Sequence, residues 1–548
     1  RRALPMDDTQ RLLTFSESLH ALGEAQSGVT DEQSGGVAFH QLMYCGENDI
    51  MSAGRVLQLF PGQALKYTVQ RIYPEVVLYP LTQSELLEHV MNLIAEATAS
   101  SAQESLEGGG TPVFVCTDVQ PAGDYQADLT FDLVNSAVPI EDAHSISQVS
   151  IRAPCGASQM SLPAPGGTVQ TEHFHLLSLM MQSHAAGRDL CLVGPAGAGK
   201  SFMSRIFARA LGYAPVQTLF VYQDMTARDL LQRRSTDEFG ATTWIPTPLT
   251  IAMQEGRLAV LDGIHRLPLG TISALLRLLD EREITLFDGT SFVCPARYAE
   301  MQERLGLTEE ELSARGIFLV HPSFRVLALA NPPTKQEPWL NNEVLHLFHF
   351  FDVEMDLVSD VGKSRNVDLL SLIVPGVSTD FANAICEFAM HLEQMDEDPL
   401  SSVKSPVSLR QMLRMARRAA EWPDEVHSSL YNACMMMYMP KSDKEEVIAL
   451  MDTVGIPQNE EEYSVTALPL VVTDADGNET DDAISRGETT LDSQVVSQLV
   501  DAQVVSRRQG RLPVEMRENP DAVAKERWQR VAFKTLDGMS SDEAEEES

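Results

Sequence analysis

The stretch that constrains the fold most is GPAGAGKS, residues 194–201. It fits the pattern G-x-x-x-x-G-K-[ST] and stands between an apolar run, DLCLV, and a segment with helical spacing, FMSRIFARAL. A strand, a glycine-rich loop and a helix in this order bring backbone N–H groups to a helix N-terminus, where they converge on phosphate oxygens. The sequence therefore predicts a P-loop, also called a Walker A motif.

The pattern also assigns the contacts that each position of this loop makes. The residues expected to surround the phosphates are Gly194, Pro195, Ala196, Gly197, Ala198, Gly199, Lys200 and Ser201. Lys200 is expected to reach the β- and γ-phosphates of ATP, and Ser201 to ligate Mg²⁺. The alternative is a glycine-rich turn without a ligand. The flanking strand and helix favour the binding site.

A second acidic group is predicted at the end of the run LAVLD. Four apolar residues, 258–261, precede Asp262, which indicates a buried strand that ends on an aspartate. Its expected role is to hold the hydration shell of the Mg²⁺ ion. The chain contains no N-K-x-D motif, the pattern that reads guanine, so a GTPase is not favoured.

The order of patterns along the chain predicts its organisation. Strand-like runs alternate with helical ones from about 170 to 355, which indicates a parallel α/β sheet. The predicted strands are DLCLVG, VQTLFVY, RLAVLDG, FRVLALAN and FDVEMDLV. The predicted parts are a helical segment over 1–100, a small β module over 113–168, a nucleotide-binding domain over 170–355, a helical lid over 356–456 and an acidic, largely disordered region over 457–548.

Composition excludes several classes of partner. The 548 residues carry a net charge of −37, which argues against DNA or RNA, because phosphate backbones are held by clusters of Lys and Arg. No run reaches the roughly 18 apolar residues of a membrane-spanning helix.

The seven cysteines form no C-x-x-C pair and are interpreted as reduced, buried thiols. The first residue is not Met, so the N-terminus is interpreted as processed or cut from a longer chain.

Longer motifs resemble those of the AAA+ ATPases, in the dynein- and midasin-related branch. They are VYQDMTARDLLQRR, GATTWIPTPLTIAMQEGRLAVLDGIHRL and ISALLRLLDEREITLFDGTSF. The resemblance covers about residues 55–456 and is strongest over 180–350. It implies a P-loop AAA+ parallel-sheet module that is followed by an all-helical lid and preceded by a helical segment and a small β module. The helical N-terminus would then be the lid of a preceding module.

The resemblance implies roles for four further residues. Asn331, at the end of FRVLALAN, resembles sensor 1, a polar side chain that positions the attacking water. Arg410, in SLRQMLRMARR, resembles the sensor-2 arginine of the lid, with a surface arginine as the alternative. Arg266 and Arg282 are candidates for contacts between modules, with ordinary surface pairing as the alternative.

Two departures from the family pattern bear on hydrolysis. Family ATPases carry Asp-Glu at the strand end, whereas this chain has Asp262 followed by Gly263. Near the place of the family's arginine finger the sequence is LHLFHFF, with His349. His265 is a conceivable substitute for the missing base. If only the side chain of the family's glutamate is missing, Gly263→Glu is expected to raise the rate of ATP hydrolysis. His349, with Arg266, is expected to face a neighbouring module.

The resemblance leaves two functions open. The first is an ATP-binding AAA+ module of a multi-module ATPase, in which hydrolysis drives remodelling of a protein partner in the parent protein. The second is a structural scaffold that binds ATP–Mg²⁺ without appreciable hydrolysis. Expected partners are ATP, neighbouring AAA+ modules in the same chain or a homo-oligomer, and a protein client that the sequence does not identify. The resemblance implies a mitochondrial location, and cytoplasmic is the alternative.

Overall fold

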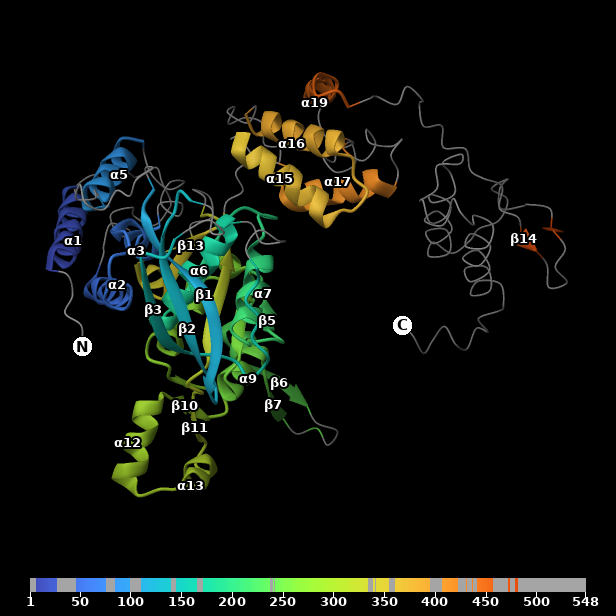
Figure 1. The fold of residues 1–548 in the computed structure, drawn as a ribbon. Helices are drawn as coiled ribbons and strands as arrows, with labels where there is room; N and C mark the ends of the chain where they lie inside the picture. The colour runs from blue at the N-terminus through green and yellow to red at the C-terminus, as the bar shows by residue number, and fades with distance from the viewer. Residues whose placement is uncertain are drawn as a thin grey trace. The chain divides into compact units, whose positions relative to one another are not determined.

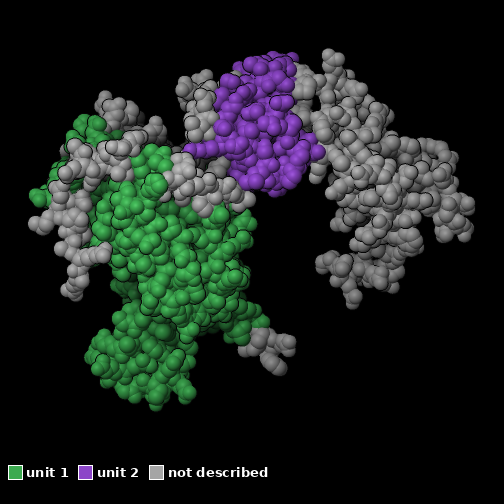
Figure 2. Space-filling view, in the orientation of Figure 1, with its two compact units in different colours: residues 1–355 green, residues 356–548 purple. Residues whose placement is uncertain are grey.

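The computed structural model describes most of the first two thirds of the chain. The described residues are 6–26, 46–74, 84–98, 110–138, 144–164, 171–236, 240, 242–333, 339–340, 342–353, 360–394, 407–421, 430, 436, 441–456, 472–473 and 479–480. The chain divides into two compact units, Arg1–Met355 and Asp356–Ser548 (Figure 2). Each unit is described by itself.

A five-stranded parallel sheet forms the centre of the first unit (Figure 1). Its strands are β4 (Asp189–Val193), β5 (Gln217–Phe220), β8 (Leu258–Asp262), β12 (Arg325–Ala330) and β13 (Phe348–Asp352). Their order across the sheet is β13-β4-β12-β8-β5, and every neighbouring pair is parallel. The carboxyl ends of all five strands therefore meet at one edge, where ligands of open α/β sheets bind.

Apolar cores cover both faces of this sheet. Along β4, Leu190 and Leu192 belong to one core, and Cys191 and Val193 belong to the other, as the two-residue period of a strand requires. Because both faces are buried, the central strands are continuous apolar runs instead of alternating ones.

Helices on each side of the sheet supply these cores. In the first unit they are α6 (Thr171–Ala185), α7 (Lys200–Ala210), α8 (Ala227–Leu231), α9 (Pro248–Glu255), the 3₁₀ turn η3 (Ile264–Arg266), α10 (Leu269–Ser273), α11 (Leu276–Asp280) and α14 (Asn342–Leu345). Met180 and Met203, from α6 and α7, pack on the face of Leu190, and Met253 from α9 packs on the face of Cys191.

Local signals set the ends of α9, the helix that leads into β8. Thr247 caps the N-terminus, where its hydroxyl accepts a hydrogen bond from the Thr250 N–H, and Pro248 occupies the first helical position. The helix ends at Gly256, whose φ of 68° is in the left-handed region. The chain then reverses into the apolar run of β8.

Four N-terminal helices share a core with the sheet. They are α1 (Met6–Gln26), α2 (Glu47–Leu59), α3 (Leu65–Ile72) and α5 (Ser84–Thr98). Buried Leu12, Phe15 and Val69 belong to the same apolar cluster as Cys191. That these helices are the lid of a preceding module stays a prediction.

A small antiparallel sheet packs against α6. It consists of β1 (Pro112–Gly123), β2 (Gln126–Asn135) and β3 (Ser147–Pro154) in the order β1-β2-β3. Two side chains of α6 bond to the backbone of β1: the Ser178 hydroxyl accepts from the Cys116 N–H at 3.0 Å, and Gln182 donates to the Phe114 carbonyl at 2.7 Å. Buried backbone groups at this edge are thereby satisfied.

Two insertions in the α/β region have no counterpart among the predicted elements. The first is the hairpin of β6 (Gln232–Thr236) and β7 (Thr242–Pro246). The second contains β9 (Ile284–Thr285), β10 (Ser291–Val293), α12 (Pro295–Leu305), α13 (Glu309–Ala314) and β11 (Ile317–Leu319). The second insertion has its own small core of Val293, Tyr298 and Leu312.

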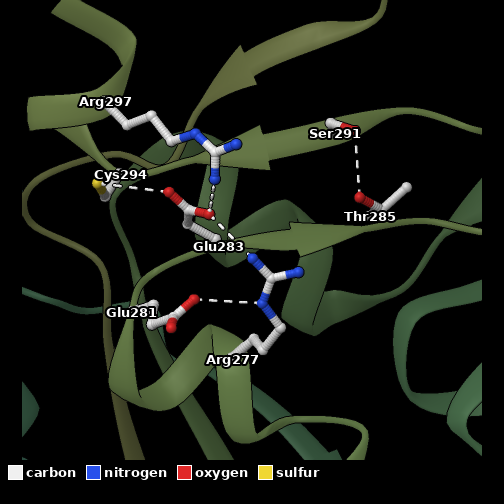
Figure 3. A network of polar contacts seen from close by, with 7 residues as sticks. All are labelled: Arg277, Glu281, Glu283, Thr285, Ser291, Cys294 and Arg297. Atoms are coloured by element: carbon white, nitrogen blue, oxygen red, sulfur yellow. Dashed lines mark hydrogen bonds and ion pairs between the residues drawn. The ribbon is translucent and has the colours of Figure 1, made fainter. Parts of the chain in front are cut away.

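Glu283 anchors the second insertion at its base (Figure 3). Its carboxylate lies within 3.2 Å of the Arg277 guanidinium, and it also pairs with Arg297. The Glu283 side chain is 9% exposed, whereas those of Arg277 and Arg297 are 65% and 52% exposed. One buried carboxylate thus joins α11 to the start of α12.

The described part of the second unit is mainly helical. Its elements are α15 (Asp360–Ile373), α16 (Thr379–Gln394), α17 (Leu409–Glu421), α19 (Lys441–Thr453) and a two-stranded sheet of β14 (Val472–Thr473) and β15 (Glu479–Thr480). None of the helices in the described residues is long and apolar enough to cross a membrane.

The predicted fold class and the order of its parts are confirmed. The last strand begins earlier than predicted: β13 spans Phe348–Asp352 and overlaps the predicted run FDVEMDLV only at Phe351 and Asp352. The buried run of Phe348, Phe350 and Phe351 sets this strand, and His349 in its middle interrupted the apolar pattern. Residues 354–359 lie outside the described part, and the residue bounds of the predicted domains stay a prediction.

Candidate nucleotide-binding site

The P-loop joins β4 to α7 at the carboxyl edge of the sheet. Gly194 donates its N–H to the Ala330 carbonyl at 3.2 Å. A Cβ at Gly194 would lie 2.4 Å from the Val353 carbonyl oxygen, so only glycine fits there. Gly197 and Gly199 have φ values of 89° and 106°, a region that side chains disfavour. These glycines let the loop turn directly into the N-terminus of α7.

Lys200 connects the P-loop to the end of a neighbouring strand. Its ammonium donates to the carbonyl oxygens of Gly194 and Pro195, at 2.6 and 2.8 Å, and to the Asn331 side-chain oxygen at 3.1 Å. Asn331 follows β12, which is paired with β4. The structure therefore brings together two residues that the sequence separates by 131 positions.

Asn331 is held at its backbone as well as at its side chain. Its N–H donates to Nδ1 of His265 at 3.2 Å, and its carbonyl oxygen accepts from the Trp339 indole N–H at 3.1 Å. Trp339 is buried. The contacts of His265 and Trp339 could not be predicted from the sequence, because no spacing pattern links either residue to Asn331.

The two predicted metal ligands, Asp262 and Ser201, lie at a strand end and in the first turn of a helix. Asp262 is the last residue of β8, pairs with Leu329 of β12 and is half-buried. Ser201 is exposed in the first turn of α7. No group of three or more His, Cys, Asp or Glu in the described part of the chain could hold a metal ion. Mg²⁺ usually takes one or two protein oxygens and completes its shell with phosphates and water.

The same residues fit a bound triphosphate. Lys200 carries the positive charge, and the 11-residue helix α7 turns its N-terminus to the loop. A hydroxyl from Ser201 and a carboxylate from Asp262 are the hard oxygen donors that Mg²⁺ prefers. The donor set thus suits ATP with Mg²⁺.

Gly263 is constrained by its backbone. Its φ is 94°, and its N–H donates to the Leu329 carbonyl at 2.9 Å. A Cβ at this position would lie 3.2 Å from the Val221 carbonyl oxygen. The structure does not meet the condition set for Gly263→Glu, that only the side chain is missing, since the backbone here is left-handed and a Cβ would crowd the Val221 carbonyl.

His265 does not fit the role of a substitute base. Its Nδ1 accepts the Asn331 N–H, so in the neutral ring the proton resides on Nε2 and neither nitrogen is free to take another from water. Burial, together with the charges of Arg266 and Lys200, lowers the pKa of His265 to about 4. The ring is therefore neutral at pH 7, and its chemistry is that of a hydrogen-bonding group.

The predicted interface role of His349 is wrong. The ring is 1% exposed and lies between two hydroxyls, that of Ser52 at 2.8 Å and that of Ser183 at 2.9 Å. Burial, with the charges of Arg188 and Arg71, holds the pKa of His349 well below its usual value. A neutral histidine in the core of the first unit cannot face a neighbouring module.

The predicted arginines lie in different surroundings. Arg282 pairs with buried Asp189 at 2.6 Å, with side chains 17% and 1% exposed, so it stabilises the start of β4 instead of an interface. Arg266 is exposed on η3, and its interface role stays a prediction. Arg410 is exposed on α17 in the second unit, and its sensor-2 role also stays a prediction.

Comparison with known families identifies the region that contains the site. Residues 189–348 match the model described as AAA domain (dynein-related subfamily). The chain carries an AAA+ domain of the dynein-related subfamily. The resemblance inferred from the motifs is thereby confirmed, and this region is a nucleotide-binding module.

Three relatives show how far the similarity extends. Von Willebrand factor A domain-containing protein 8 of Mus musculus is 32% identical over 421 residues, which is 76% of this chain and 21% of the relative. Protein NorQ of Paracoccus denitrificans is 31% identical over 28% of this chain and 52% of its own length. Denitrification regulatory protein NirQ of Stutzerimonas stutzeri is 28% identical over 24% of this chain and 48% of its own length. The chain thus spans about a fifth of the mouse relative and about half of the bacterial ones.

Proposed function

We propose that this AAA+ domain binds ATP with Mg²⁺ at residues 194–201. The observation that carries the proposal is the contact of Lys200 with Asn331, which joins the phosphate loop to the end of β12. Lys200 would contact the β- and γ-phosphates, and Ser201 and Asp262 would hold the metal. Asn331 would contact the γ-phosphate side of the nucleotide, and the sensor-2 role of Arg410 stays a prediction from the resemblance.

Hydrolysis by this segment alone is proposed to be slow. Asp262 is assigned to the metal, Gly263 has no side chain, and His265 is held by Asn331. Loss of a positioned general base costs about 10²–10⁴ in rate, and loss of an arginine finger costs on the order of 10³ or more. Asn331 can orient a water molecule, but its amide cannot accept the proton.

In the parent protein, the domain is proposed to act as one module of a multi-module ATPase. The chain spans 21% of the mouse relative, so there is room for further modules in a relative of that length. Hydrolysis in such an assembly would drive remodelling of a protein client, and a neighbouring module could supply the groups that this one lacks.

The second candidate function is a structural scaffold that binds ATP without hydrolysing it appreciably. The left-handed backbone of Gly263 favours it, since the turn after Asp262 is shaped for a residue without a side chain. Both candidate functions include ATP binding, and they differ in the rate of ATP hydrolysis.

Binding is tested with the full 548-residue chain and a fluorescent ATP analogue. Lys200→Ala is expected to abolish binding, because it removes the charge at the phosphates. The control is Arg209→Ala, an exposed arginine in the last turn of the same helix, which should leave the affinity within about twofold. Unchanged affinity in Lys200→Ala would refute the proposed site.

A mitochondrial location is proposed from the similarity to the mouse relative alone. Fractionation of cells that produce the tagged full-length protein tests it. Recovery of the protein only in the cytosolic fraction would refute the mitochondrial proposal and support the cytoplasmic alternative.

A further inference from the structure

Asn331 is held in place by a histidine from the turn that follows Asp262. His265 lies in η3, three residues beyond Asp262 and directly after Gly263 and Ile264. Its Nδ1 accepts the Asn331 N–H at 3.2 Å, and on the other side of the residue Trp339 donates to the Asn331 carbonyl at 3.1 Å. The residue assigned to the γ-phosphate therefore has its backbone fixed from two directions.

The direction of the hydrogen bond determines the state of the ring. A backbone N–H can only donate, so Nδ1 of His265 carries no proton and the neutral ring is protonated at Nε2. A protonated ring would lose this acceptor and would place a second positive charge close to Lys200. The contact with Asn331 and the charge of Lys200 thus favour the same neutral form.

We propose that His265 is a positioning residue that fixes the backbone of Asn331 and so holds the Asn331 side-chain amide beside Lys200. This position of the amide gives the site a preference for ATP over ADP. The inference rests on the proposed nucleotide site and goes beyond it. In the proposed site Asn331 is the residue assigned to the third phosphate, and ADP lacks that phosphate. A displacement of the Asn331 backbone should weaken contacts to the γ-phosphate and leave the α- and β-phosphate contacts of the P-loop unchanged.

The mechanism is one of pre-organisation. An asparagine side chain at a loop start has rotational freedom, and holding its backbone in advance reduces the entropy lost when a ligand binds. Lys200 already contacts the Asn331 side-chain oxygen, so a shift of the peptide would also move this oxygen away from the ammonium. The His265 contact thus links the turn after β8 to the phosphate loop.

The test measures the ratio of ATP to ADP affinity for the full chain by competition with a fluorescent nucleotide in the presence of Mg²⁺. His265→Ala removes the acceptor and is expected to lower the ratio about tenfold, the effect of losing one hydrogen bond. His265→Asn places a side-chain oxygen close to the position of Nδ1 and is expected to keep the ratio within about twofold. Thermal unfolding of each variant checks that it is folded.

The chain offers a matched control at the other end of the same strand. His321 precedes β12, and its Nδ1 accepts the Ser323 N–H at 3.1 Å, the same type of contact that His265 makes after β12. His321→Ala should leave the ATP to ADP ratio unchanged. In the double variant His265→Ala with Asn331→Ala, the ratio should fall no further than in Asn331→Ala alone, because His265 acts through Asn331.

The outcomes separate the inference from the proposed function. An unchanged ratio in His265→Ala, while Lys200→Ala abolishes binding, would overturn the inference and leave the nucleotide site intact. Equal losses in His265→Ala and His265→Asn would also overturn it. If His265→Ala does not fold, His265→Gln, whose oxygen is one bond further out, replaces it with the same expected loss. Failure of the unaltered chain to bind ATP would overturn both proposals.

Discussion

At the residue scale, Gly263 determines whether the site can activate a water molecule for hydrolysis. Its N–H continues the ladder between β8 and β12 through the Leu329 carbonyl, and its φ of 94° turns the chain into η3. A carboxylate at this position would require both a new side chain and a different backbone. The difference from the family pattern is therefore conformational as well as chemical.

Gly263→Glu is expected to destabilise the protein without increasing turnover. A side chain in this backbone region costs about 1–3 kcal/mol, and its Cβ would be 3.2 Å from the Val221 carbonyl oxygen. The measurement is thermal unfolding together with steady-state ATP turnover. Gly270→Ala is the control, since a Cβ there meets nothing within 4 Å. A tenfold rise in turnover at unchanged stability would show that the turn adapts to a glutamate.

At the element scale, the insertion between β9 and β11 depends on the polar contacts at its base. Glu283 receives hydrogen bonds from Arg277 and Arg297, which lie before and after it in the chain. Breaking a fully buried pair costs 3–5 kcal/mol. A smaller loss, about 2 kcal/mol, is expected here because both arginines are more than half exposed.

Glu283→Ala should therefore loosen the insertion while the sheet stays folded. Hydrogen exchange of residues 284–319, followed by mass spectrometry, should accelerate more than tenfold, with little change in α7. Glu300→Ala is the matched control, because it removes an exposed pair with Arg304 at 3.0 Å on α12, worth up to about 0.5 kcal/mol. Equal exchange in the two variants would contradict an anchoring role for Glu283.

At the scale of the whole molecule, the central sheet could be predicted from the sequence, whereas much less of its surroundings could. The apolar runs around residues 190, 260 and 328 have strand length and lie next to glycine, aspartate or asparagine, so their strands could be predicted. The P-loop spacing indicated Lys200, the end of an apolar run indicated Asp262, and the family resemblance implied Asn331. These signals are local in sequence, because they reflect the backbone geometry of a strand and of the loop that follows it.

What the sequence did not reveal depends on contacts between distant residues. The burial of His349 between Ser52 and Ser183 brings together α2, α6 and β13, and no periodicity links these segments. The hydrogen bonds that His265 and Trp339 make with Asn331 likewise form only after the strands have paired. The conformation of Gly263 could not be predicted either, because glycine is compatible with many turns.

The most direct test of the proposed site is a single-turnover experiment with ATP labelled at the γ-phosphate and the full chain in excess, with Mg²⁺. We expect ATP to bind, Lys200→Ala to abolish binding, and bound ATP to be hydrolysed at about 10⁻² s⁻¹ or slower, since a missing base costs at least about 10² relative to ordinary enzymes. Hydrolysis at about 1 s⁻¹ or faster that is lost in Lys200→Ala would contradict the proposed slow turnover, because some group other than those described would then activate the water.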